Sequence, residues 1–302
     1  MSTMRNLRHL DIRECHSLSH IPIGIGRLIH LQTLSMFIMG KKGGCGISEL
    51  QGLNNLRGPL HIKGLENMKN SMDAEEANLI RKRNLDSLTL SWSRYIDDQT
   101  PIIQENASSE EVLEGLQPPA TIKRLEIENY QGMKFPGWME DLSLQNLVRV
   151  VLKDCQRCKH LPPLGHLPLL KFLELSRIDS VRHLGTVEFY SGGVDDLGKG
   201  GFTLLEDIVL EEMLNLEELL LNVAEGREVL RCLVSMKIKN CDKLTTLPLL
   251  PSLQRLELKT QNENIPDGLL QIQNLSALQD QLNFLSATTS SHCQVCLLGL
   301  GN

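Results

Sequence analysis

The sequence lacks both an export signal and a membrane-spanning run, and these absences exclude two classes of protein. Its first fifteen residues, MSTMRNLRHLDIREC, contain no apolar core of a signal peptide. No apolar stretch approaches the ~20 residues that a helix needs to cross a bilayer. We therefore expect a soluble, cytoplasmic chain with no membrane partner.

The chain also lacks an excess of positive charge and is poor in cysteine. Its net charge of −6 and pI near 5.9 disfavour binding to nucleic acid, because affinity for the phosphate backbone comes from clustered lysine and arginine. Eight cysteines in 302 residues are too sparse for a disulfide scaffold, and without an export signal we expect them to remain thiols. The glycosylation patterns at Asn106 and Asn274 are then chance matches.

Signatures of catalysis are missing as well. The patterns G-x-S-x-G, H-E-x-x-H and the EF-hand do not occur, and the nine histidines are scattered along the chain. Residues 193–200, GVDDLGKG, match a phosphate-binding loop up to Lys199, but Gly200 stands where such a loop needs the Ser or Thr that holds magnesium. We expect a flexible loop between repeats there, no cofactor and no enzymatic activity.

What the sequence has in abundance is leucine at a regular spacing. The pattern L-x-x-L-x-L recurs at intervals between 20 and 37 residues, most of them within the range of leucine-rich repeats. A strand of this kind buries only one face, so the copies must stack to form a core. The copies are Leu7/Leu10/Ile12, Leu31/Leu34/Met36, Leu85/Leu88/Leu90, Ile122/Leu125/Ile127, Leu147/Val150/Leu152, Leu170/Leu173/Leu175, Leu205/Ile208/Leu210, Leu233/Met236/Ile238 and Leu253/Leu256/Leu258, with a looser copy at Leu60/Ile62.

These copies predict an α/β fold, a leucine-rich-repeat solenoid with a curved parallel sheet on its concave face and irregular turns and short helices on its convex face. Residues 1–260 form the repeat domain, with about ten irregular repeats. Residues 261–302 form an atypical tail that loses the repeat. Helical spacing of apolar residues between Ile272 and Leu285 indicates a cap, and we expect the rest of the tail to be disordered.

A Cys-x-x-Cys pair, Cys155 and Cys158, could hold a metal, form a redox couple or be structural. Overlaying the repeats places Cys155 at the Asn/Cys position of the consensus, together with Cys15 and Cys241 of other copies. It places Cys158 where other copies have a core leucine. We therefore predict two buried, unreactive thiols. A zinc site would need Cys293 and Cys296, far away in the tail, so no metal site is predicted.

Two interruptions of the repeat predict short helices. Asp73-Ala-Glu-Glu76 has the pattern of a capping box, and the helix should run through Arg83 with Ala74, Ala77 and Ile80 on its buried face. Residues 93–109 have no apolar period and predict a mobile loop. A second short helix should follow from Glu110 to Leu116.

The variable positions between the leucines are the candidates for binding, because these side chains project from the concave sheet face. We expect a patterned surface with exposed aromatics and a purely acidic strand at 206–212, suited to recognition of a protein. The alternative is a merely solvated sheet face. The candidates are Arg8, His9, Asp11, Arg13, Trp92, Lys123, Glu126, Glu128, Tyr130, Arg149, Lys153, Lys171, Phe172, Glu174, Glu206, Asp207, Glu211, Lys237 and Lys239.

Several irregular stretches, in a fixed order, carry a resemblance to a known family. They are MRNLRHLDIRECHSLSHIPIGIGRLIHLQTLSMFIMG, GISELQGLNNLRGPLHIKGLENM, DAEEANLIRKRNLDSLTLSWS, LQPPATIKRLEIENYQGMKFPGWM and HLPPLGHLPLLKFLEL. Over about residues 4–260 the chain resembles the leucine-rich-repeat region of plant coiled-coil nucleotide-binding disease resistance proteins, which are intracellular immune receptors.

The resemblance implies a non-enzymatic recognition domain in the defence response. Its partners would be a pathogen effector, a guarded host protein, or a nucleotide-binding switch domain in cis or in trans. Because the receptors' coiled coil and nucleotide-binding module are missing, and Leu7 begins a core strand without a polar cap, we expect a truncated receptor. The alternative is a scaffold or adaptor unrelated to pathogen sensing, such as a substrate receptor of a ubiquitin ligase.

Overall fold

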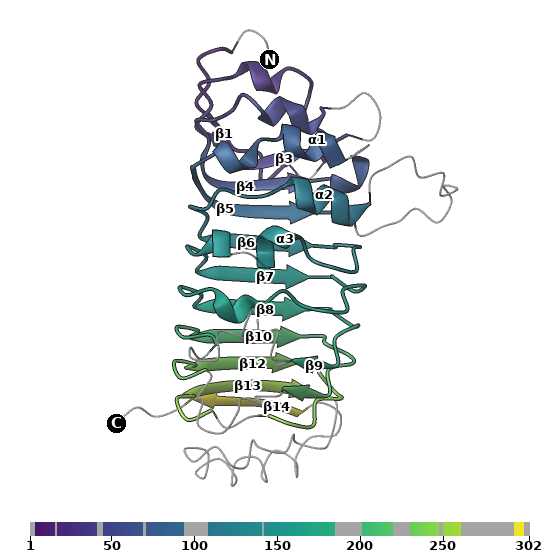
Figure 1. The fold of residues 1–302 in the computed structure, drawn as a ribbon, viewed down its shortest axis with the longest axis vertical. Helices are drawn as coiled ribbons and strands as arrows, with labels where there is room; N and C mark the ends of the chain where they lie inside the picture. Colours follow the sequence, from purple (N-terminus) through teal and green to yellow (C-terminus); the bar gives the residue numbers. More distant parts are fainter. Residues whose placement is uncertain are drawn as a thin grey trace, which may run out of the picture. The chain divides into compact units, whose positions relative to one another are not determined.

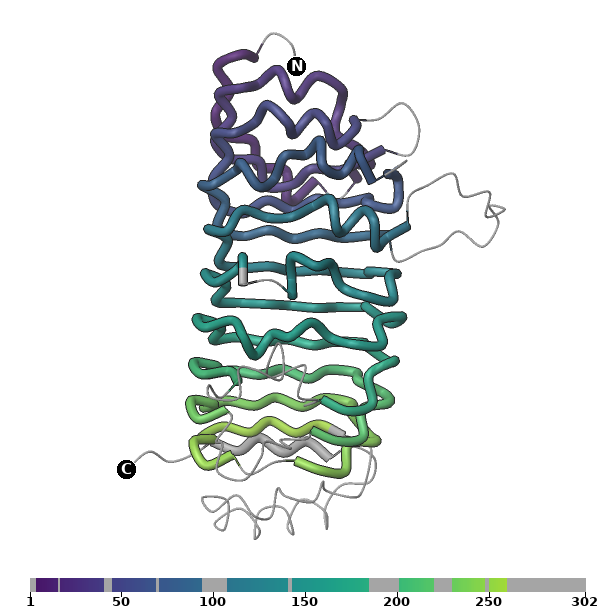
Figure 2. Tube along the Cα trace, in the orientation of Figure 1, coloured from purple at the N-terminus to yellow at the C-terminus, as the bar shows by residue number. Residues whose placement is uncertain are grey.

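The chain divides into two compact units, which we call the N-terminal unit (Met1–Leu147) and the C-terminal unit (Val148–Asn302). Figures 1 and 2 show a computed structural model, in which each unit is a succession of backbone coils that each contribute a strand. The structure describes residues 4–15, 17–40, 45–68, 71–93, 108–140, 142–184, 201–219, 230–247, 250–260 and 293–298.

The strands of the N-terminal unit are parallel. Strand β1 (His9–Leu10) pairs with β2 (Thr33–Leu34). The larger sheet then runs from β3 (Met36–Ile38) through β4 (Arg57–Lys63) and β5 (Asn84–Ser91) to β6 (Arg124–Glu128). Each strand thus pairs with the strand of the next repeat.

The C-terminal unit repeats this arrangement. Its sheet runs in parallel through five strands in sequence order, and a sixth strand then pairs antiparallel with the fifth. These are β7 (Arg149–Lys153), β8 (Phe172–Ser176), β10 (Asp207–Glu211), β12 (Ser235–Lys239), β13 (Arg255–Thr260) and β14 (Cys293–Leu298). A second, two-stranded parallel sheet joins β9 (His183–Leu184) to β11 (Glu218–Leu219).

The repeat leucines form the core, which confirms the leucine-rich-repeat fold. The core leucines include Leu88, Leu125, Leu173 and Leu210, which are at most 1% exposed. On each strand, the residues next to these leucines point to the other face of the sheet. One position was predicted wrongly. Phe37, and not Met36, is the buried residue of the second copy. The strand is interrupted at Ser35, between β2 and β3, and the alternation of buried and exposed side chains shifts by one residue there.

Short helices fill the segments between strands, and in Figure 1 they overlie one face of strands β4 to β6. The α-helices are α1 (Ser71–Glu76), α2 (Ser109–Gly115) and α3 (Gly137–Glu140). The 3-10 turns are η1 (Ile25–Arg27), η2 (Ile47–Leu50), η3 (Leu65–Asn67), η4 (Leu79–Arg81), η5 (Leu142–Leu144) and η6 (Leu164–His166).

The first predicted helix is shorter than expected. It ends at Glu76, and Asn78 then adopts a left-handed conformation with φ of 49° before η4 begins. This break rotates the next turn, so that Leu79 is buried while Ile80 is 52% exposed. The prediction of Ala74 and Ala77 as buried residues is confirmed, and that of Ile80 is wrong.

The second predicted helix is confirmed as α2, with an N-terminal cap that was not predicted. The Ser108 hydroxyl accepts a hydrogen bond from the Glu111 backbone amide, and the Glu111 carboxylate accepts one from the Ser108 amide. This reciprocal pair satisfies two backbone donors that the first turn of a helix leaves open.

Several predicted features lie outside the described residues: the phosphate-loop near-match at 193–200, most of the loop at 93–109 and most of the tail. Within the tail only β14 is described, and this strand was not predicted. Among the described residues, no helix is long and apolar enough to cross a membrane.

Glu49 links two successive coils of the N-terminal unit. Its carboxylate accepts hydrogen bonds from the backbone amides of Gly24, at 2.8 Å, and Gly26, at 2.6 Å. The approach is so close that a Cβ on Gly26 would lie 2.6 Å from the Glu49 carbonyl oxygen. Glycine at position 26 is therefore required by the space that Glu49 occupies.

Replacing Gly26 with alanine should lower the free energy of unfolding by about 1–3 kcal/mol, because the added methyl group must displace the Glu49 backbone. Chemical denaturation measures this change. Gly52→Ala is the matched control, since its Cβ would meet its nearest neighbour at an ordinary 3.8 Å. Equal losses in the two variants would contradict the close fit.

Lys82 follows η4 in the chain, and its fully buried amine lies at the end of η2. Its Nζ donates a hydrogen bond to the Leu50 carbonyl at 2.6 Å and lies 3.5 Å from the Leu53 carbonyl. The side chain is 0% exposed, and burial lowers the pKa of its amine from 10.5 to about 8. A cation suits the carbonyls at a helix C-terminus, but it costs free energy to desolvate. Here the two carbonyls also accept backbone hydrogen bonds, from the Leu53 and Leu56 amides.

This depressed pKa makes stability depend on pH in a defined direction. The unfolded chain binds the Lys82 proton more tightly, so the wild-type protein should gain stability relative to Lys82→Met as the pH rises from about 8 to 10.5. The gain is roughly 3 kcal/mol in free energy of unfolding. Denaturation of both proteins at several pH values measures it, and a difference that stays constant with pH would contradict the assignment.

Candidate functional site: the sheet face opposite the leucine core

The side chains that face away from the core of the C-terminal unit form three columns across five parallel strands. Strand register sets them side by side, one residue from each of β7, β8, β10, β12 and β13. Column one is Arg149, Phe172, Asp207, Ser235 and Arg255; column two is Val151, Glu174, Val209, Lys237 and Glu257; column three is Lys153, Ser176, Glu211, Lys239 and Lys259.

The predicted acidic strand is present, but its charges are paired with bases from other repeats. Glu206 accepts a hydrogen bond from Lys171 at 2.6 Å. Asp207 lies 3.8 Å from Arg255, and Glu211 lies 4.0 Å from Lys239. The strand is therefore one member of a set of paired charges and not an isolated negative surface.

Arg149 and Glu174 form the most connected cluster of the columns. Glu174 lies 3.4 Å from Arg149 and 3.3 Å from Lys153, so one carboxylate serves two cations. The Arg149 guanidinium also sits 3.4 Å from the centroid of the Phe172 ring, a cation–π contact. These interactions hold an arginine and an aromatic ring, both partly exposed, in column one on β7 and β8.

A further charged row follows the strand ends. Asp154, Arg177 and Glu212 each come directly after a strand and adopt a left-handed conformation, with φ between 52° and 55°. Arg177 donates to both oxygens of Asp154, at 2.6 and 2.7 Å, and lies 3.7 Å from Glu212. The hydrogen bond with Asp154 raises the pKa of Arg177, although desolvation opposes the shift.

In the N-terminal unit, the predicted residues of the first repeat lie exposed around β1. Asp11 and Arg13 pair with each other, and hydrogen bonds from Arg13 hold the pKa of Asp11 well below its usual range. His9 is hydrogen-bonded to the Thr33 hydroxyl at 3.0 Å, and Arg8 is exposed. These four residues are accessible, as expected.

The exposure predicted for Trp92 and Tyr130 is wrong. Trp92 is 5% exposed and Tyr130 is 0% exposed, and their ring centroids lie 5.2 Å apart. Tyr130 also packs on Phe135, and its hydroxyl donates to the Lys134 carbonyl. Both residues come after the end of a strand, where the chain turns back toward the core, so the alternation of the strand no longer applies to them.

The other predicted residues of this unit lie on or just before β6, and two of them lie near His61, which was not predicted as a site residue. Glu126 and Glu128 lie on the face of β6, and Lys123 is exposed just before this strand. His61 on β4 lies 2.8 Å from the Ser91 hydroxyl and 4.0 Å from Glu128. Burial and then Lys63 lower its pKa to about 4, and Glu126 offsets only part of this, so His61 is neutral at pH 7.

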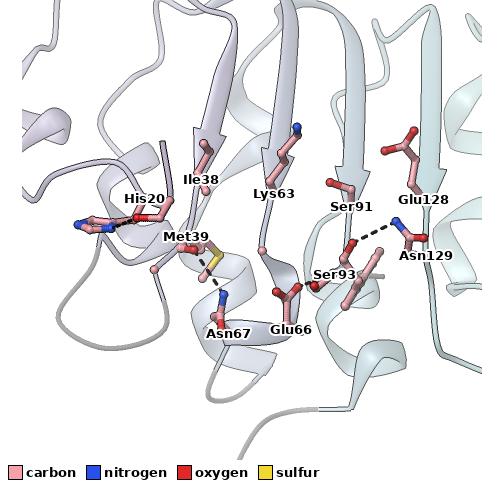
Figure 3. Close-up of a pocket in the computed structure, with 14 residues that line it drawn as sticks. His20, Ile38, Met39, Lys63, Glu66, Asn67, Ser91, Ser93, Glu128 and Asn129 are labelled. Atoms are coloured by element: carbon pink, nitrogen blue, oxygen red, sulfur yellow. Dashed lines mark hydrogen bonds between the residues drawn. The ribbon is translucent and has the colours of Figure 1, made fainter. Parts of the chain in front are cut away.

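A pocket of about 610 Å³ opens where β3 to β6 end. Figure 3 shows Lys63, Ser91 and Glu128 on one rim, and Glu66 and Asn67 on the other. Glu66 already accepts a hydrogen bond from the Ser93 amide at 2.8 Å. The lining combines groups of both charges with no cluster of three or more metal-ligating side chains among the described residues.

The prediction that Cys155 and Cys158 are buried is confirmed, since both are 0% exposed. Cys241, at the same repeat position as Cys155, is 4% exposed, and burial raises the pKa of its thiol to about 11. A protonated, buried thiol is a poor nucleophile and a poor metal ligand. His160 and His166 lie in the turn that follows.

Comparison with known proteins decides the family. The family described as R13L1/DRL21 LRRs matches residues 47–178. The chain belongs to the family of leucine-rich-repeat regions found in R13L1/DRL21-type plant disease resistance proteins. This confirms the resemblance drawn from the irregular stretches of sequence.

Three relatives from Solanum bulbocastanum illustrate the similarity. RGA1 is 35% identical over 87% of this chain, and RGA4 is 37% identical over 89%. The protein named "Disease resistance protein RGA2" is 34% identical over 62%. The chain spans only 24%, 26% and 21% of the lengths of these relatives.

A looser similarity is found among solved structures. A chain from "Crystal structure of TLR13-ssRNA13 complex" aligns with 83% of this chain at 15% identity, and 38% of that chain is covered. Its TM-score of 0.35 is too low to add to the fold described above.

The Asp154–Arg177 pair should contribute to the stability of the C-terminal unit. Asp154→Ala should lower the free energy of unfolding by about 1–3 kcal/mol, because the partly buried guanidinium loses two charge-assisted hydrogen bonds. A double-mutant cycle with Arg177→Ala separates this interaction from the separate effects of the two side chains. A coupling free energy near zero would contradict it.

Proposed function

We propose that this leucine-rich-repeat region is a non-enzymatic recognition domain of plant defence, which senses a pathogen effector or a guarded host protein through its sheet face. The relatives named for disease resistance support the defence role over the scaffold or adaptor alternative. In a receptor that contains a nucleotide-binding switch, the same repeats would also contact and restrain that switch.

The observation that carries the proposal is the set of three columns on the C-terminal unit. Five parallel strands present fifteen positions in fixed register, with Val151 and Ser176 buried and charges of both signs among the others. Arg149 and Phe172 stand in this array as an arginine–aromatic pair, the combination enriched at the energetic centres of protein interfaces. The pattern of opposite charges adds specificity for a complementary partner.

The charged side chains of the array are oriented before a partner binds. Several acids and bases of the columns are held by partners on other strands, as Glu174 is by Arg149 and Lys153. Such groups are already oriented, so a partner does not have to order them on binding. We place the candidate residues Arg149, Lys153, Phe172, Glu174 and Lys237 in this recognition surface.

A binding experiment tests the role of the face. The full chain is screened by two-hybrid assay against pathogen effectors and host defence proteins, and the affinity of a partner is then measured for the double variant Arg149→Ala, Phe172→Ala. We expect a loss of at least about tenfold, since such anchors contribute 1–2 kcal/mol or more. Co-expression of the partner with a receptor that carries these repeats should trigger cell death in leaves, and the double variant should abolish this response.

The matched control is Leu169→Ala, Leu214→Ala, which removes two exposed apolar side chains from turns of the same unit. Its affinity should stay close to that of the wild type, with circular dichroism spectra unchanged for all proteins. A partner that binds the face variant as tightly as the control would show that recognition takes place elsewhere.

A further inference from the structure

We infer that the sheet face of the C-terminal unit binds an acidic, extended segment of its protein partner. This inference rests on the proposed function and adds the chemistry of the partner. It follows from the charge of the three columns, from the cations that remain available in them, and from a short apolar row between the charges.

The three columns are positively charged, although the whole chain is negative. They contain six basic and four acidic side chains, a net charge of +2, whereas the chain carries −6. Column three is the most basic, with Lys153, Lys239 and Lys259 against Glu211. A positive surface on a negative protein attracts negative partners to that surface in particular.

The bases of column three are only partly neutralised. Lys239 lies 4.0 Å from Glu211, the limit of an ion pair, and Lys153 shares Glu174 with Arg149. Lys259 has no ion pair or hydrogen bond with any side chain that the structure describes. An incoming carboxylate would therefore meet the amines of Lys239 and Lys259, which have the weakest pairing on this face within the described part of the chain.

A short apolar row lies on the same face. Phe172 of β8 in column one and Val209 of β10 in column two come from adjacent strands and are partly exposed, whereas Val151 of β7 is only 3% exposed. One side of the Phe172 ring is covered by Arg149 at 3.4 Å, which fixes the ring in place. An aliphatic or aromatic side chain of the partner can pack here while neighbouring acids reach column three.

The dimensions fit a short extended peptide. Adjacent strands of a sheet are about 4.8 Å apart, so the five strands β7 to β13 extend over about 19 Å. An extended chain advances about 3.3 Å per residue, so about six residues cross them. The partner segment is thus about six residues long, rich in Asp and Glu, with an apolar residue near its middle.

Two labelled peptides test the preference for charge on the full 302-residue chain. The acidic peptide is DEFDLE, and the basic peptide KKFKLK keeps its apolar residues. Fluorescence anisotropy should show the acidic peptide binding at least about tenfold more tightly, and more weakly as salt is added. Equal affinity for the two peptides, or affinity independent of salt, would overturn the inference.

Charge reversal at column three is the decisive variant. Lys239→Glu with Lys259→Glu changes the columns from +2 to −2, because each substitution changes the charge by two units. Acidic-peptide affinity should fall at least about tenfold, and the preference should reverse toward the basic peptide. The control Lys159→Glu with Lys243→Glu makes the same change in exposed turns, and its affinity should stay within about twofold.

Two further outcomes keep the inference and the proposed function apart. The milder pair Lys239→Gln, Lys259→Gln should also weaken acidic-peptide binding if the reversed variant fails to fold. If the acidic peptide does not bind while Arg149→Ala, Phe172→Ala still abolishes binding of a protein partner, the charge inference is wrong and the proposed function stands. If the acidic peptide does not bind and Arg149→Ala, Phe172→Ala leaves the binding of a protein partner unchanged, the proposed function is wrong as well.

Discussion

The structure depends on one constraint: each strand buries a single face, so it is stable only beside a strand with the same alternation. Parallel pairing in register satisfies this for β4 and β5, and again for β8 and β10. It fills the core with leucine and leaves every second side chain on the opposite face. The same register that aligns Leu173 with Ile208 aligns Glu174 with Val209. One strand register therefore determines both the packing of the core on one face of the sheet and the arrangement of the proposed recognition surface on the other.

Much of this could be predicted from sequence because the leucine spacing is periodic. It located the repeat strands of both units, though not β9, β11 or β14, and the buried Cys155 and Cys158. The overlay of repeats also contains the pairing of Glu211 with Lys239, since both follow aligned core residues. What it could not give was whether two such side chains approach closely, because that depends on rotamers and on the twist of the sheet.

The wrong predictions fall where the alternation stops. Trp92 and Tyr130 stand just beyond strand ends, and Ile80 stands just beyond a left-handed asparagine. Met36 follows a break in the strand. In each case a local change of backbone direction decides which side chain is buried, and a single change of this kind leaves no periodic signal. The left-handed conformation of Arg177 and Glu212 is similarly hard to foresee, since neither residue type favours it.

The contact of Glu49 with Gly24 and Gly26 has a consequence for how the molecule opens. Leu7 and Leu10 of the first repeat are only partly buried, whereas Ile25, within η1, is 0% exposed. Fraying that starts at the first repeat can therefore advance easily until it reaches η1, where it must break two short hydrogen bonds to a carboxylate held by the next coil. Glu49 thus marks the boundary between a first repeat that opens locally and a body of repeats that unfolds together.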